Sequence, residues 1–127
     1  MAVKLGHKIY VAGPWVYRTY VREVAQRLEH EGHEVVSRWY NRDDAGADEY
    51  STQAVQDLVE LDQANLFVVF NAAKSEGKSF EAGYAHGRGI PTVVVGPITA
   101  PGTCIFYHLP QVTVLPTEAA LVGWLKA

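Results

Sequence analysis

Residues 66–85 read LFVVFNAAKSEGKSFEAGYA, and this stretch indicates the class of fold. The continuous apolar run Leu66–Phe70 is typical of a central parallel strand that is covered on both faces. A loop of small polar residues follows it and leads into a helix that ends near Gly87 and Gly89. This order predicts an anion-binding site at the helix start, because the first helical N–H groups have no partner within the helix.

Glu81 is the first candidate functional residue. We place it in the first turn of this helix, where the helix dipole favours a carboxylate. In an open α/β fold this position lies at the edge of the sheet where ligands bind. A first-turn carboxylate also stabilises a helix without any further role, so this segment alone leaves both interpretations open.

Strand and helix signals alternate along the rest of the chain. Short apolar runs predict four further strands, at 9–12, 34–39, 92–95 and 112–115. Apolar residues at helical spacing and capping residues predict three further helices, at 17–30, 51–63 and 118–126. Ser51 and Thr117 are the expected N-terminal caps. The inner face of the 51–63 helix is expected to carry Ala54, Val55, Leu58 and Leu61.

Two segments lack a regular pattern. Residues 41–50 are expected to form an exposed loop, and residues 96–110 a long irregular connection. Five strands that alternate with helices predict a single-domain α/β fold over residues 1–127. The expected architecture is a doubly wound, five-stranded parallel sheet of Rossmann or flavodoxin type, with strand order 2-1-3-4-5 and helices on both faces.

Composition and charge exclude several classes of protein. A net charge of −3 argues against a protein that binds the backbone of nucleic acids. No apolar stretch approaches the ~20 residues of a membrane span, and residues 1–8 lack the apolar core of a signal peptide. The single cysteine, Cys104, allows no internal disulfide and suits the reducing cytoplasm, where we expect the protein. It is a weak candidate nucleophile, since a lone cysteine in apolar surroundings is usually inert.

The sequence gives little sign of a metal site. No two histidines have the spacing of metal ligands, and His86 is expected on the surface or in the core. The acidic run Asp43, Asp44, Asp48 and Glu49 could suggest a divalent cation, but a solvated acidic loop is the commoner meaning. We therefore expect neither a metal nor a cofactor.

The loops that follow the first four strands of such a sheet meet at one edge. They would gather Tyr10, the turn from Gly13 to Arg18, and segments 38–40, 71–81 and 96–108. With Asp57 on the second helix, this edge offers two carboxylates beside an anion site. Trp15, Trp39 and Tyr40 also lie in these loops and are suited to stacking on a base, although ordinary packing explains each of them equally well.

Three segments carry a likeness to a known family: 8–14 (KIYVAGP), 57–65 (DLVELDQAN) and 77–85 (GKSFEAGYA). Together they resemble the nucleoside 2-deoxyribosyltransferase superfamily, and especially its branch of nucleoside 5′-monophosphate N-glycosidases. The last segment matches the family's Gly-x-x-x-Glu-x-Gly-x-Ala, and the separation of Asp57 from Glu81 fits the hydrolase branch. Pro14 departs from the pattern, since it stands where hydrolases often carry a small hydroxyl residue.

The resemblance implies catalytic roles for three residues. Glu81 would be the nucleophile that attacks the anomeric C1′ carbon and displaces the base. Asp57 would transfer a proton or orient the sugar and base, and Tyr10 would hold the Glu81 carboxylate. Such roles agree with retaining glycoside cleavage, which uses two acidic residues.

The resemblance also implies a set of substrate-binding residues. Ser75 stands where the hydrolases carry a phosphate-binding serine, and Gly77 and Ser79 would add further donors. Transferases of free nucleosides typically carry an aspartate there, so a serine favours a phosphorylated substrate; a plain loop residue remains the alternative. His108 either replaces an asparagine that transferases take from a neighbouring subunit or is an ordinary loop histidine. The expected substrate-binding set comprises Gly13, Trp15, Arg18, Trp39, Ser75, Gly77, Ser79 and His108.

We therefore expect an N-glycosidase that cleaves the base–sugar bond of a (deoxy)nucleoside 5′-monophosphate, a small-molecule substrate. One alternative is a nucleoside 2-deoxyribosyltransferase that moves deoxyribose between bases. Another is a non-catalytic nucleotide sensor, which would not need both Asp57 and Glu81. A third is a flavodoxin-like module that binds a flavin, which leaves the paired carboxylates unexplained.

The resemblance further implies a homodimer or higher homo-oligomer in which a neighbouring subunit completes each site. Five apolar residues exceed what one thin sheet can bury: Leu58, Leu61, Phe106, Tyr107 and Leu109. We expect some of them to meet a partner, with the 96–110 connection near the partner's site.

Overall fold

The computed structural model describes residues 6–42, 47–98 and 104–127, and within these ranges five strands form one sheet. The strands are β1 (Lys8–Ala12), β2 (Glu34–Val35), β3 (Leu66–Phe70), β4 (Thr92–Val95) and β5 (Thr113–Leu115). Their order is β2-β1-β3-β4-β5, and every neighbouring pair is parallel. The predicted fold class and strand order are confirmed.

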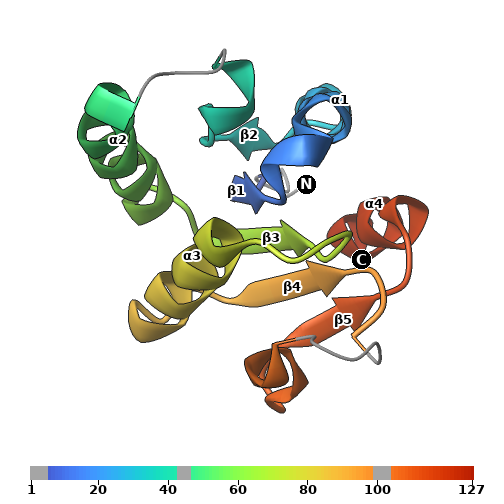
Figure 1. Ribbon diagram of the computed structural model, residues 1–127. Helices are drawn as coiled ribbons and strands as arrows, with labels where there is room; N and C mark the ends of the chain where they lie inside the picture. The colour runs from blue at the N-terminus through green and yellow to red at the C-terminus, as the bar shows by residue number, and fades with distance from the viewer. Residues whose placement is uncertain (1–5, 43–46, 99–103) are drawn as a thin grey trace.

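In the same ranges, four α-helices cover the sheet: α1 (Arg18–His30), α2 (Tyr50–Asp62), α3 (Glu76–Gly87) and α4 (Glu118–Lys126). Helices α1 and α4 lie on one face of the sheet, and α2 and α3 lie on the other (Figure 1). An ion pair of 3.3 Å between Arg27 and Glu118 joins the first pair of helices. Hydrogen bonds from Tyr84 and Arg88 to Asp62 join the second pair. No helix in the described residues is long and apolar enough to cross a membrane.

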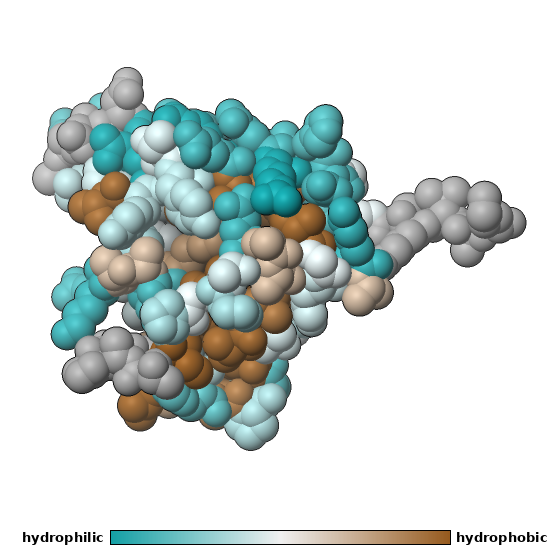
Figure 2. Space-filling view, turned by 90° about the vertical axis from the view of Figure 1, so that its right-hand side faces the viewer, coloured by the Kyte–Doolittle hydropathy of each residue, from teal (hydrophilic) through white to brown (hydrophobic). Residues whose placement is uncertain are grey.

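The central strands supply much of the core. Tyr10 of β1 and Phe67 of β3 are fully buried, and their rings stack with centroids 5.9 Å apart. Leu28 of α1 and Leu61 of α2 belong to the same buried cluster from opposite faces of the sheet. Burial on both faces explains why the strands read as continuous apolar runs. On the face shown in Figure 2, the upper part, at the level of α1, is mostly hydrophilic, and hydrophobic residues gather lower down.

Strand β2 is shorter than predicted, because side chains replace the backbone ladder beyond Val36. The Ser37 hydroxyl accepts a hydrogen bond of 3.0 Å from the Val11 N–H, and the Trp39 indole donates one of 2.7 Å to the Val11 carbonyl. The chain then turns into the 3-10 helix η2 (Trp39–Asn41) instead of continuing as a strand to residue 39. The end of β1 is therefore satisfied by side chains, which position η2 beside it.

Helix α2 begins one residue earlier than predicted, at Tyr50, so Ser51 lies inside the helix and is not its cap. The preceding 3-10 helix η3 (Ala47–Glu49) runs directly into α2, and Glu49 at the cap position makes no side-chain capping bond. The predicted inner face of α2 is buried only towards the C-terminal end of the helix. Leu61 is fully buried and Leu58 is partly buried, whereas Val55 is 61% exposed. Residues 43–46 of the predicted loop lie outside the described residues.

Helix α3 begins at Glu76, with Ser75 as its N-cap. The Ser75 hydroxyl accepts a hydrogen bond of 3.3 Å from the Lys78 N–H. Glu81 therefore lies in the second turn, so its predicted place in the first turn is wrong. The attraction between a carboxylate and the helix dipole falls off beyond the first turn, so helix stabilisation alone does not account for Glu81.

The predicted irregular connection contains a further turn. Residues 105–108 form the 3-10 helix η4 (Ile105–His108), while residues 99–103 lie outside the described residues. Leu61 and Tyr107, two of the apolar residues expected to meet a partner, are buried within the chain itself.

Candidate active site

Tyr10 and Glu81 are brought together between the sheet and α3. Tyr10 lies in β1, and its phenol donates a hydrogen bond to Oε2 of Glu81 in α3. Tyr10 is fully buried because β1 is a central strand of the sheet. This hydrogen bond fixes one oxygen of the carboxylate and joins two of the three residues that we expected to be catalytic.

The surroundings of Glu81 favour its protonated form. Burial raises the pKa of Glu81 to about 7, while the hydrogen bond from Tyr10 opposes this rise and the charge of Asp57 adds to it. Burial also raises the pKa of Tyr10, and the neighbouring Glu81 charge raises it further. The phenol thus remains a hydrogen-bond donor at every physiological pH, while Glu81 changes its charge near neutrality.

Asp57 is paired with a cation that the sequence analysis missed. Nη2 of Arg42 lies 2.8 Å from Oδ1 of Asp57, and both side chains are about three-quarters buried. Burial raises the pKa of Asp57, and Arg42 opposes that rise. Arg42 follows η2 in a segment that reads as an exposed loop, so only the fold brings it to α2.

Glu60 is a second acidic residue that the sequence analysis missed. It is buried, and its carboxylate accepts hydrogen bonds from the Arg38 N–H at 2.9 Å and from the Gln56 amide at 2.8 Å. These bonds tie the start of η2 to α2. The i, i+3 spacing of Asp57 and Glu60 in the predicted helix was an available signal that both point to one side of α2.

The start of α3 combines polar groups with a buried cation. Ser75 caps the helix, and a Cβ placed at Gly77 would lie 3.8 Å from the Ser75 hydroxyl, so the backbone is open there. Lys78 is buried, which lowers the pKa of its amine. Its Nζ lies 3.1 Å from Oδ1 of Asn71 and 5.5 Å from the centre of the Tyr107 ring.

The two tryptophans occupy different environments. Trp39 is buried, with its indole bonded to the Val11 carbonyl, whereas Trp15 is about one-third exposed. The two rings lie 6.3 Å apart, and the Arg18 guanidinium lies 4.5 Å from the Trp15 ring. A Cβ on Gly13 would lie 2.9 Å from the Val21 side chain, so close packing against α1 explains this glycine.

The structure does not gather all of the expected substrate-binding residues into one place. Ser79 lies beside Tyr107 and Cys104 in a cavity between α3 and η4. His108 is exposed on η4, with its Nε2 3.0 Å from the Ile98 carbonyl oxygen. Within residues 6–42, 47–98 and 104–127, no group of three or more His, Cys, Asp or Glu residues could hold a metal ion. Asp43 and Asp44 of the acidic run lie outside these ranges.

Comparison with known proteins identifies similar folds and the family of this chain. Solved structures with a similar fold include a conserved protein from Enterococcus faecalis V583, at a TM-score of 0.64 and 18% identity over 95% of this chain and 98% of that chain. They also include the CMP N-glycosidase BcmB of Clostridium botulinum, at a TM-score of 0.61 and 17% identity over 94% of this chain and 98% of that chain. No curated protein matches the sequence. The family model described as nucleoside 2-deoxyribosyltransferase matches residues 9–108, from β1 to the end of η4, and the chain belongs to that family.

Proposed function

We propose that the protein is an N-glycosidase that cleaves the base–sugar bond of a (deoxy)nucleoside 5′-monophosphate. The observation that carries this proposal is the hydrogen bond from the buried Tyr10 phenol to Glu81, beside the Asp57–Arg42 pair. A pair of acidic residues in distinct environments is what retaining glycoside cleavage needs. The name of BcmB, a CMP N-glycosidase of similar fold, supports the same class of reaction.

In the proposed mechanism, the Glu81 carboxylate attacks C1′, the C1′–N bond breaks, and the base leaves with a proton. Tyr10 holds one carboxylate oxygen, so the other oxygen is directed to the sugar. Burial raises the pKa of Asp57, which suits a group that supplies this proton or orients the sugar. Water then attacks C1′ and gives its proton to the Asp57 carboxylate, which releases the sugar phosphate and regenerates the Glu81 carboxylate.

The direct test is to incubate the protein with a panel of nucleosides and 5′-monophosphates and to follow the release of free base. We expect release from at least one monophosphate and a covalent sugar phosphate on Glu81 in rapidly quenched samples, seen by intact mass. A protein that binds monophosphates but releases no base would be a nucleotide sensor, and the proposal would be wrong.

We further propose that Ser75 and the start of α3 hold the 5′-phosphate. Because Ser75 is the N-cap of α3, its hydroxyl lies beside the first N–H groups of the helix. This arrangement favours the binding of an anion. Ser75→Ala should then raise the KM for the monophosphate and barely change that for the nucleoside. Thr117→Ala is the matched control, because Thr117 caps α4 with a bond of 3.1 Å to the Ala120 N–H. Equal KM changes for both substrates would contradict the phosphate role.

The family match also supports a second candidate, a nucleoside 2-deoxyribosyltransferase. Both reactions share the glycosyl-enzyme and differ in whether water or a second base attacks it. Adding an isotopically labelled free base to the reaction separates them. We expect free sugar phosphate as the product; labelled nucleotide as the main product would establish the transferase.

We propose in addition that the protein is at least a homodimer. The outward sides of α2 and α3, which lie side by side on one face of the sheet, expose large apolar residues that include Val55 and Phe80. Sedimentation should show a dimer, and Val55→Glu should shift it towards monomer. A wild-type monomer with full activity at the assay concentration would contradict the proposal.

A further inference from the structure

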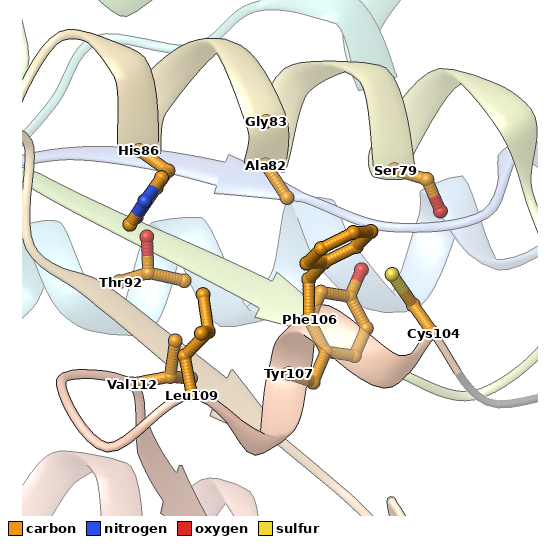
Figure 3. A pocket seen from close by; sticks show the side chains of 10 residues that line it. All are labelled: Ser79, Ala82, Gly83, His86, Thr92, Cys104, Phe106, Tyr107, Leu109 and Val112. Carbon is orange, nitrogen blue, oxygen red and sulfur yellow. The ribbon is translucent and has the colours of Figure 1, made fainter.

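A separate cavity of about 400 Å³ lies between α3 and η4. Figure 3 shows its lining, with Ser79, Ala82, Gly83 and His86 on the α3 side and Phe106 and Tyr107 on the η4 side. At 3.6 residues per turn, Gly83 lies about 200° around the helix from Glu81. The cavity is therefore on the other side of α3 from the candidate active site.

The described residues that line this cavity are mostly apolar. They include no Asp, Glu, Lys or Arg, and apolar side chains such as Leu109 and Val112 form much of the wall. An anionic ligand would lose its hydration there, and Lys78, whose Nζ lies 5.5 Å from the centre of the Tyr107 ring and bonds to Asn71, is not part of the lining. The volume lies within the ~300–1,000 Å³ of pockets that hold small molecules.

One polar group in the lining lacks a well-formed hydrogen bond. The Tyr107 side chain is 2% exposed, and its hydroxyl makes no hydrogen bond of good geometry within the described residues, although the Ser79 side chain lies close enough to lower its pKa slightly. Figure 3 shows this hydroxyl at the end of the cavity that Ser79 and Cys104 also line. Burial raises the pKa of Tyr107 to about 12, so the phenol is protonated at neutral pH. A buried donor of this kind favours a ligand with a hydrogen-bond acceptor.

We propose that this cavity binds a small uncharged heteroaromatic molecule, whose ring packs against Phe106 and whose acceptor atom receives the Tyr107 hydrogen bond. The aromatic lining favours a flat ring, because offset or edge-to-face contacts add to the burial of its surface. The apolar lining disfavours phosphorylated ligands, so we expect an occupant that differs from the substrate of the proposed reaction.

The first experiment compares two probes of nearly equal shape, quinoline and naphthalene, of which only quinoline carries an acceptor nitrogen. Ligand-observed NMR titration should give saturable binding of quinoline, with a higher affinity than naphthalene. Tyr107→Phe should weaken quinoline binding about fivefold, the value of one neutral hydrogen bond, and leave naphthalene unchanged. If both probes lose affinity equally, or if neither binds saturably, the assignment is wrong.

The second experiment fills the cavity. A Cβ at Gly83 or at Gly87 would meet no atom within 4 Å, but only Gly83 lines the cavity. Gly83→Leu should therefore abolish quinoline binding, whereas Gly87→Leu on the same helix should retain it, with both variants folded by circular dichroism. Equal effects of the two substitutions would overturn the proposal. The proposal would also be overturned if the wild type did not bind quinoline and Gly83→Leu dissociated a dimer. In that case the cavity would belong to a subunit interface.

Discussion

The two sides of α3 differ in whether the buried polar groups beside them have hydrogen-bond or charge partners. On the side of Glu81, two carboxylates, an arginine and a phenol contact or influence one another, and each polar group has a partner or a nearby charge. On the other side, the wall is mostly apolar and the Tyr107 hydroxyl makes no hydrogen bond of good geometry within the described residues. The first side can stabilise changes of charge, as a reaction requires. The second side favours an uncharged ligand, since burying a charge against an apolar wall is costly.

The two sides of α3 also differ in how they contribute to the stability of the fold. Burial makes the ionised form of Glu81 costly, whereas apolar burial on the other side favours folding at every pH. Perturbed acids of this kind cluster at functional sites.

The largest expected effect is on turnover. Glu81→Gln keeps the size of the side chain and its bond to Tyr10 but removes the nucleophilic charge, so base release should fall at least about a thousandfold. Glu23→Gln, at an exposed position of α1, is the control and should change turnover little. Near-normal turnover of Glu81→Gln would rule out the covalent mechanism.

The next effect concerns stability and pH. Because the folded-state pKa of Glu81 is raised from 4.5 to about 7, the folded form binds this proton more tightly than the unfolded form. Protonation of Glu81 therefore adds about 3 kcal/mol to the free energy of unfolding. This contribution is fully present below about pH 4.5 and is lost as the pH rises to about 7. Urea unfolding at about pH 5 and about pH 8 should show this loss of stability in the wild type but not in Glu81→Gln. An unchanged pH dependence would mean that Glu81 is ionised normally.

Glu60 should contribute through its hydrogen bonds. Glu60→Ala leaves the Arg38 N–H and the Gln56 amide without their acceptor, so the free energy of unfolding should fall by about 2 kcal/mol. Glu60→Gln keeps one acceptor oxygen and should lose less. Glu34→Ala, at an exposed position in β2, is the control for removal of a glutamate. Equal losses for Glu60→Ala and Glu34→Ala would show that these bonds are not needed.

The smallest effect is on the pH profile of the rate. If Glu81 attacks as a carboxylate, kcat/KM should fall about tenfold for each pH unit below about pH 7. Tyr10→Phe removes the hydrogen bond that lowers the pKa of Glu81, so this acidic limb should move to higher pH. A limb that stays in place would show that another group controls the profile.

The sequence alone predicted the sheet order and the positions of the central strands. It did so because parallel strands buried on both faces leave continuous apolar runs that are local and easy to recognise, as at Leu66–Phe70. It also selected Tyr10, Asp57 and Glu81, because the likeness of three segments to one superfamily marked them. Local cues failed at the ends of elements, where Ser37 and Trp39 end a strand through bonds to a residue far away in the chain.

Only the tertiary structure brought Arg42 to Asp57, placed Glu60 under η2 and buried Lys78 beside Tyr107. Arg42, Glu60 and Lys78 are charged, and from the sequence alone each is expected to be a solvated side chain, since nothing near it in the sequence specifies its partner. The division of α3 into a charged side and an apolar side was likewise decided by what packs against it. Sequence spacing places Glu81 and Gly83 on different sides of the helix, but the β1 phenol and the η4 aromatics that face them come from distant segments.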